Sequence, residues 1–130
     1  MIIVDSSIFI ALADKRDQWH KRALDLKEYI EDQEILVTDL IISEVLTEIG
    51  NRHGGKKGDL LYKYFKDNCK ILYSSEDAFD AAEEIYLNHD GKLSIPDSFS
   101  IHVMNDLSIN KIVSFDSDFD KVKGITRIFE

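Results

Sequence analysis

The chain has a single cysteine and no long apolar segment, and each shortage excludes a class of protein. Because Cys69 is alone, no intrachain disulfide or cysteine-rich zinc site can form. A helix that spans a bilayer needs roughly 20 apolar residues, and no run in the chain approaches that length. The apolar run 1–4 lacks a preceding basic segment and ends at Asp5, which indicates a strand and not a signal peptide. These shortages predict a cytoplasmic protein with no membrane segment.

What the chain does contain is typical of a soluble globular protein. Its 130 residues are 44% hydrophobic and 32% charged. This composition supplies enough apolar material for one well-buried core. We therefore expect a single domain over residues 1–130.

The net charge of −9 is unevenly distributed along the chain. Residues 71–107 carry eight acidic side chains against Lys92, a net charge of −7. Residues 51–70 carry six basic side chains against two acidic ones, a net charge of +4. Such a basic segment is either a solvated helix face or a surface that meets a polyanion. In the second case the candidate contacts are Arg52, Lys56 and Lys57.

Apolar periodicity predicts strands that alternate with helices. Strands are expected at residues 1–5, 35–37, 69–73 and 111–115, with a short fifth at 126–129. Helices are expected at 8–12, 16–32, 39–49, from 60, from 78 and at 96–107. Three glycines between residues 51 and 58 predict a loop, and Ser74 with Asp77 predicts a capping box. This order predicts an α/β fold, a three-layer αβα sandwich around a mainly parallel sheet of four or five strands.

Four apolar stretches that are spread along the chain each end in a carboxylate: Asp5, Glu44, Asp97 and Asp116. Asp5 and Asp116 follow predicted strands, and ligands of parallel sheets gather at the carboxyl ends of the strands. Glu44 and Asp97 lie in or near the first turns of predicted helices. The expected topology therefore brings all four acids towards one edge of the sheet.

Carboxylates that gather at one place need either protonation or a cation. Two carboxylates about 5 Å apart repel by roughly 3 kcal/mol at an effective dielectric of about 20. Hard divalent cations that prefer oxygen ligands relieve this repulsion. Convergence of the acids would thus predict one or two Mg²⁺ or Mn²⁺ ions.

Each acid also has a simpler interpretation. Asp5 could serve only as a helix cap, and Asp97 could serve only to favour a helix dipole. Glu44 lies off the centre of its apolar stripe and could be solvated surface, with Glu48 as the substitute candidate. Asp116 could belong to a polar turn. The joint placement of the acids is what favours a functional site.

Six segments that cover essentially residues 1–129 match a known family in its order: Ile3–Ser7, Ala11-Leu12 with Asp14, His20–Ala23, Ile41–Leu46, Leu93–Phe99 and Ile112–Phe119. Each motif alone is weak, whereas the ordered set is fairly specific. In these segments the chain resembles the PIN-domain family, and within it the ribonuclease toxins of VapC type.

This resemblance implies a PIN-like sandwich that cleaves RNA with Mg²⁺ or Mn²⁺. It implies that the family's acids and supporting hydroxyls correspond to Asp5, Glu44, Asp97, Asp116, Ser7 and Ser114. Asp118 also falls where a metal-facing acid is expected, so the sequence leaves open whether Asp116 or Asp118 is the main fourth acid. The polyanion that meets Arg52, Lys56 and Lys57 would then be RNA.

The resemblance also implies an antitoxin protein as a partner and a homodimer. Two alternatives stay open. One is a non-catalytic PIN-like module that binds RNA or a protein. The other is a PIN nuclease outside toxin–antitoxin systems, which processes rRNA or tRNA or cleaves DNA.

Other phosphate and metal motifs fit the sequence poorly. Ser7 occupies the second acidic position that an Asp-x-Asp phosphotransferase needs. Lys121 stands where a calcium loop beginning at Asp116 requires glycine. The glycines at 54 and 55 lie between predicted helices and not after a strand, so they do not form a P-loop.

Overall fold

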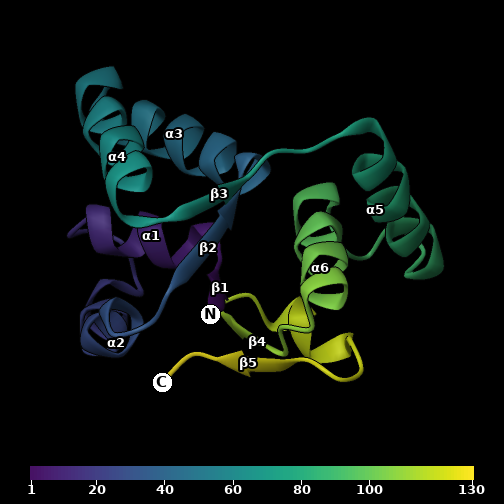
Figure 1. Cartoon of the computed structure of the whole chain (residues 1–130). Coiled ribbons are helices and arrows are strands. Elements are labelled where there is room, and N and C mark those ends of the chain that lie inside the picture. The colour runs from purple at the N-terminus through teal and green to yellow at the C-terminus, as the bar shows by residue number, and fades with distance from the viewer.

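The computed structural model describes residues 1–130 and shows a parallel sheet enclosed by helices (Figure 1). The strands are β1 (Ile2–Val4), β2 (Ile35–Thr38), β3 (Lys70–Leu72), β4 (Lys111–Val113) and β5 (Thr126–Ile128). The helices are α1 (Ser6–Ala13), α2 (His20–Glu31), α3 (Asp39–His53), α4 (Gly55–Asn68), α5 (Glu76–Asn88), α6 (Ile95–Leu107) and the short 3-10 helix η1 (Ser117–Lys121).

The five strands form one sheet in the order β3-β2-β1-β4-β5, and every neighbouring pair is parallel. Strand β1 is central, with Ile3 paired to Leu36 on one side and to Ile112 on the other. All three residues of β1 are buried, which matches a continuously apolar strand covered on both faces. The expected parallel sheet, including its short fifth strand, is confirmed.

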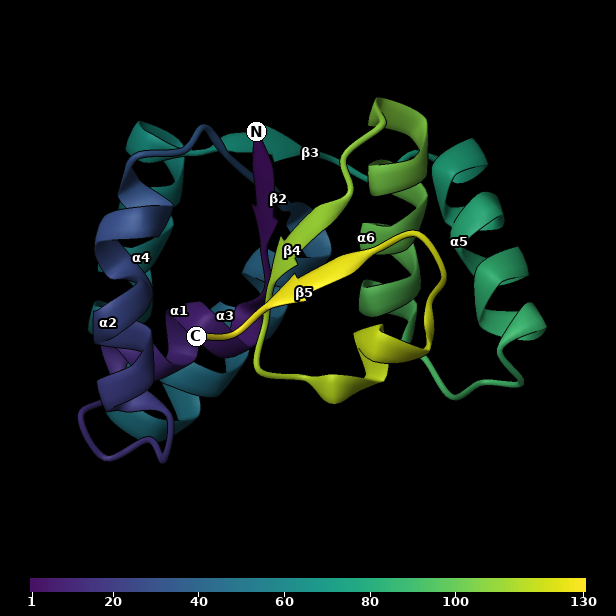
Figure 2. The same ribbon diagram turned by 90° about the horizontal axis from the view of Figure 1, so that it is seen from below.

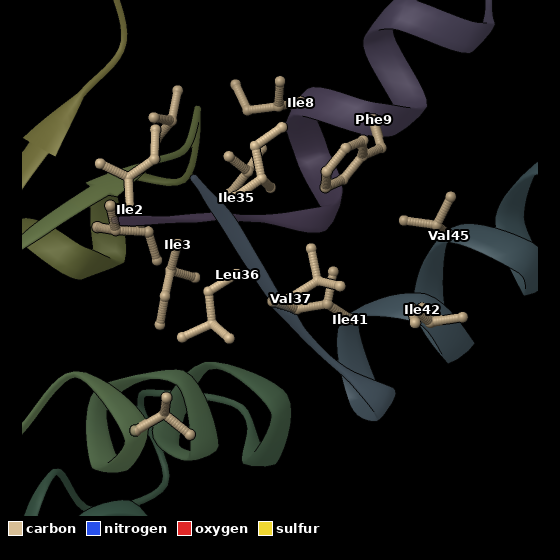
Figure 3. Packing of buried hydrophobic residues seen from close by; sticks show 14 of the residues in the cluster. Ile2, Ile3, Ile8, Phe9, Ile35, Leu36, Val37, Ile41, Ile42 and Val45 are labelled. Carbon is tan, nitrogen blue, oxygen red and sulfur yellow. The ribbon is translucent and has the colours of Figure 1, made fainter. Parts of the chain in front are cut away.

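Helices cover both faces of the sheet. Figure 2 shows α5 and α6 on one side of the strands and α1, α2 and α4 on the other. In Figure 3, Ile3 and Leu36 extend towards the green helices, whereas Ile8 and Phe9 of α1 lie on the opposite side of the strands. The predicted three-layer αβα sandwich is thus confirmed, with a core of 24 buried hydrophobic residues.

The expected helix over residues 16–32 begins only at His20. Asp14 accepts a hydrogen bond from the backbone N–H of Arg16 at 3.0 Å, and Asp17 accepts one from the N–H of Trp19 at 2.9 Å. Short acidic side chains that bond to nearby backbone groups compete with helix formation. Residues 15–19 therefore form turns in place of the first helical turn.

The prediction of a loop between residues 51 and 58 is wrong. Helix α3 continues to His53 and α4 begins at Gly55, so that Gly54 alone separates them. Gly54 has φ 91° and ψ 163°, a conformation that is essentially restricted to glycine. One glycine can therefore break the helix within a single residue, and the two other glycines enter α4.

Hydroxyl side chains cap α3 and α5. The Thr38 hydroxyl accepts a hydrogen bond from the N–H of Ile41 at 3.1 Å, so Thr38 caps α3. Helix α5 is capped by Ser75 and not by the expected pair of Ser74 and Asp77. Ser74 instead donates its hydroxyl and its backbone N–H to Asp39 at 2.8 and 3.1 Å, which ties the end of β3 to the start of α3.

No helix combines the length and the apolar character that crossing a membrane requires.

Substitution of Gly54 tests the single-residue link between α3 and α4. Gly54→Ala should lower the free energy of unfolding by about 1–3 kcal/mol, because alanine tolerates this backbone conformation poorly. Gly50→Ala is the matched control. Gly50 lies within α3, and apart from the adjoining backbone of that helix and the two chain neighbours no atom lies within 4 Å of the added methyl group. This change should therefore raise stability by up to about 1 kcal/mol.

Urea unfolding of the two variants measures both effects. Changes of the same sign at the two glycines would contradict the link described here.

Candidate functional site

The fold brings the four predicted acids towards the carboxyl edge of the central strands. Asp5 directly follows β1, and Asp116 lies three residues beyond the end of β4, the parallel neighbour of β1. Glu44 lies in the helix that follows β2, and Asp97 lies in the first turn of α6. Each acid therefore owes its place to the end of a strand or to the start of a helix.

Asp5 is the most enclosed of these acids, with 3% of its surface exposed. It precedes α1, yet its carboxylate makes no capping hydrogen bond to that helix. Its Oδ2 instead accepts hydrogen bonds from the hydroxyls of Ser114 at 2.7 Å and Ser7 at 3.0 Å. The simpler interpretation of this side chain as a helix cap is therefore wrong.

The two serines connect Asp5 to the loop after β4. The Ser7 hydroxyl accepts a hydrogen bond from the N–H of Phe115 at 3.1 Å, and the Ser114 hydroxyl accepts one from the N–H of Asp116 at 3.0 Å. Each hydroxyl thus donates to the carboxylate and accepts from the loop backbone, which uses its single proton and fixes its orientation. Loop and carboxylate are held as one unit.

Asp97 and Glu44 are disfavoured as anions in this environment. Burial, together with the charges of Asp5, Asp116 and Glu44, raises the pKa of Asp97 to about 8. Burial, together with the charges of Asp5 and Asp116, raises the pKa of Glu44 to about 7. Burial also raises the pKa of Asp5, against the opposing effect of the two serine hydroxyls. The acids are therefore close enough for their charges to act on one another.

Glu44 is not plain solvated surface. Its Oε1 atom is buried and has no hydrogen-bond partner, an arrangement that costs free energy unless a donor or a cation satisfies the oxygen. Glu48, the substitute candidate, forms a hydrogen bond to Arg52 at 2.8 Å and belongs to a different cluster. Of these two residues, it is Glu44 whose charge acts on Asp97 and raises its pKa.

Asp116 and Asp118 differ in their surroundings. The charge of Asp116 acts on Asp5, Glu44 and Asp97, and its Oδ1 accepts a hydrogen bond from the N–H of Asp118 at 2.9 Å. The side chain of Asp118 pairs with Lys121 at 2.8 Å and does not act on the three other acids. This placement favours Asp116 as the fourth acid.

The donor set fits a hard divalent cation, with one restriction. It consists only of carboxylate oxygens, and it includes three acids with raised pKa values and one buried oxygen without a partner. No group of three or more acidic, histidine or cysteine side chains is drawn together closely enough to hold one ion directly. An ion such as Mg²⁺, which keeps several of its waters and takes few protein ligands, suits this spacing.

Arg127 is a residue of the site region that the sequence does not reveal. Its guanidinium forms two hydrogen bonds of 2.9 Å with the carboxylate of Asp120 and one of 3.2 Å with the carbonyl oxygen of Ser114. These partners flank Asp116 in the chain, so Arg127 fixes both ends of the loop that carries this acid. The only signal in the sequence is a lone basic residue within a short apolar strand.

The three predicted polyanion contacts lie in different settings. Arg52 donates to Asp14, Asp17 and Glu48 at 2.8 to 3.0 Å, so its charge is engaged within the chain. Lys56 and Lys57 lie in the first turn of α4 and form no ion pair. Only the two lysines are therefore free to meet a phosphate.

Comparison with known proteins identifies the family. The family model of the PIN domain matches residues 2–125. The chain therefore belongs to the PIN domain family, as its motifs predicted. No curated protein matches the chain in sequence.

Solved structures share the fold at low sequence identity. VapC20 of Mycobacterium tuberculosis, a toxin that cleaves the sarcin–ricin loop, is 22% identical over 93% of this chain and 94% of its own, with a TM-score of 0.84. VapBC2 of Rickettsia felis, bound to a DNA fragment from its promoter, is 11% identical over 98% of both chains, with a TM-score of 0.71. A toxin–antitoxin complex from Klebsiella pneumoniae is 16% identical over 97% of this chain and 96% of its own, with a TM-score of 0.68.

The acid cluster makes a prediction about stability in the absence of metal. Because the pKa of Asp97 is raised to about 8 in the folded protein, the folded state holds a proton that the unfolded chain releases near pH 4. Stability should therefore fall as the pH rises from about 4 to about 8. Asp97→Asn removes this penalty and should stabilise the metal-free protein by at least about 1 kcal/mol more at pH 8 than at pH 5.

Urea unfolding in EDTA at the two pH values measures this difference. Asp106→Asn, an exposed acid on the same helix, is the control and should change stability equally at both. If Asp97→Asn stabilises the protein equally at both pH values, the charges of the neighbouring acids do not act on Asp97 as described.

Proposed function

We propose that the chain is a divalent-metal-dependent endoribonuclease that hydrolyses RNA phosphodiester bonds, and that it is the toxin of a toxin–antitoxin pair. The observation that carries this proposal is that the charges of Asp5, Glu44 and Asp116 all act on Asp97 in a chain of the PIN domain family. The pKa values of Asp5, Glu44 and Asp97 are all raised, in part by neighbouring acids, and such a group is costly in a site without a cation.

Each acid has a distinct part in the proposed site. Asp5, Asp97 and Asp116 would hold Mg²⁺ or Mn²⁺ directly or through water, and Glu44 would bind an ion or orient the attacking water. When bound, such an ion lowers the pKa of a water molecule and stabilises the charge that develops on phosphate oxygens. One or two ions are compatible with this donor set.

The remaining residues of the site act on the acids. Ser7 and Ser114 both donate to Oδ2 of Asp5, which leaves Oδ1 without a side-chain hydrogen bond and available to a cation. The same hydroxyls hold the backbone of residues 115 and 116. They therefore keep Asp116 oriented with respect to Asp5 before any ion binds, which lowers the reorganisation needed on binding.

RNA as the substrate class is supported by the likeness to VapC20, which is described as cleaving the sarcin–ricin loop. An antitoxin partner is supported by neighbours that were solved as toxin–antitoxin complexes. We also propose that the chain forms a homodimer and acts in the cytoplasm.

Cleavage assays test the proposed activity. Purified protein with Mg²⁺ or Mn²⁺ should cleave RNA, and EDTA should abolish cleavage. Asp5→Asn and Asp97→Asn should each reduce the cleavage rate at least about 100-fold while the far-UV circular dichroism is unchanged, because each removes a carboxylate ligand. Asp118→Asn is the matched control and should cut at a rate within a few-fold of the parent chain.

If the Asp5 and Asp97 variants cut at the parental rate, the assignment of the site is wrong. Loss of activity in the Asp118 variant as well as in the Asp5 and Asp97 variants would transfer the role of fourth acid from Asp116 to Asp118. RNA binding without cleavage under all metal conditions would instead indicate a non-catalytic PIN-like module.

A further inference from the structure

An aromatic pair borders the acid site. The rings of Trp19 and Phe115 are nearly parallel, with 14° between their planes and 5.1 Å between their centroids. Phe115 directly precedes Asp116, and its backbone N–H donates to Ser7, which itself donates to Asp5. Two hydrogen bonds therefore connect the aromatic pair to the most enclosed acid of the site.

Trp19 is unusually open for a tryptophan, with 38% of its surface exposed. The guanidinium of Arg22 lies 6.0 Å from the centroid of its ring. The only ion pair of Arg22 is a long contact of 3.7 Å with the exposed Glu130, and such pairs contribute little to stability. Arg22 can therefore move aside for a planar group that stacks on the indole, or can stack on that group itself.

A basic hollow lies beside the same turn. It has a volume of about 610 Å³, and its lining includes six basic side chains: Lys15, Arg16, His20, Arg52, His53 and Lys57. Lys15, Arg16 and Lys57 form no ion pair within the chain. Asp14 is the only acid in the lining. In a protein with a net charge of −9, this hollow is a local concentration of free positive charge.

The turn that carries both features is held in place by Arg52. Its guanidinium donates to Asp14 at 2.9 Å and to Asp17 at 3.0 Å. These two acids also accept the backbone N–H groups of Arg16 and Trp19. Arg52 is thus a positioning residue that fixes the turn, and a bound ligand finds the cations and the indole already arranged.

We propose that single-stranded RNA next to the cleaved bond binds across these two features, with a base on the Trp19–Phe115 pair and its flanking phosphates against Lys15, Arg16 and Lys57. Single strands expose bases for stacking on aromatic rings, and their phosphates require cations at short intervals along the path. An acidic peptide would use the cations but not the exposed indole. This inference rests on the proposed function for the identity of the ligand.

The single tryptophan of the chain provides a direct readout of this interaction. In EDTA, where the proposed cleavage does not occur, titration with a single-stranded RNA of about twelve nucleotides should quench the fluorescence of Trp19. A duplex of the same sequence should bind at least about 10-fold more weakly, because its bases are not free to stack.

Charge reversal distinguishes RNA binding in the basic hollow from an effect of the protein's net charge. Lys15→Glu with Arg16→Glu should weaken binding of the single strand at least about 10-fold. It should also reduce the slope of log K against log salt by about 1.4, since each lost phosphate contact contributes about 0.7 on a single strand. The control is Lys70→Glu with Lys111→Glu, which lowers the net charge equally but lies at the amino ends of β3 and β4. It should change the affinity less than about 3-fold.

Replacement of the indole tests the aromatic part, with affinity read from the anisotropy of labelled RNA. Trp19→Leu should weaken binding at least about 5-fold, and Trp19→Phe should restore most of the loss, because any aromatic ring offers a stacking face. Equal losses from the two charge reversals, or equal affinities of the leucine and parent proteins, would overturn the proposal.

These experiments distinguish failure of the proposed RNA-binding site from failure of the proposed cleavage activity. A protein that binds RNA as described but never cuts it refutes the proposed activity and keeps this site. A protein that cuts RNA, but whose Lys15 and Arg16 variant binds like the parent, refutes this site and keeps the activity.

Discussion

The hydrogen bonds from Ser7 and Ser114 to Oδ2 of Asp5 are the constraint on which the rest of the site depends. They draw the loop after β4 onto the end of β1, although more than 100 residues separate the two serines in the chain. Both hydroxyls also accept backbone N–H groups of the loop. The carboxylate of Asp5 can therefore stay buried, while Asp116 is held in electrostatic range of it.

This constraint works against a repulsion that the fold does not relieve by itself. Asp97 and Glu44 have their pKa values raised towards neutrality, and one oxygen of Glu44 has no partner. The buried acids thereby lower the stability of the metal-free protein, and they provide a set of oxygens that suits a cation. Membership of the PIN domain family and the acid cluster lead to the same proposal, since both support metal-dependent cleavage of RNA.

Much of this arrangement could be predicted from the sequence, because it depends on local patterns. Apolar runs that end in acids indicated the strands, the parallel sheet and the edge where the acids meet. The sequence could not show that Asp14 and Asp17 delay the start of α2, or that Arg52 holds their turn in place. The first effect rests on hydrogen bonds between residues two positions apart, which the helical periodicity does not reveal. The second arises from contacts between residues 35 or more positions apart. The stacking of Trp19 on Phe115 is equally non-local, because nothing in either segment indicates the other.

The most direct test of the central claim is anomalous diffraction from crystals of the protein soaked in Mn²⁺. We expect a manganese ion at the carboxyl edge of β1 and β4, bound directly or through water by at least two of Asp5, Glu44, Asp97 and Asp116. In Asp97→Asn crystals its anomalous peak should weaken or disappear. Manganese found only at other positions, with the four acids unchanged and without an ion, would contradict the account.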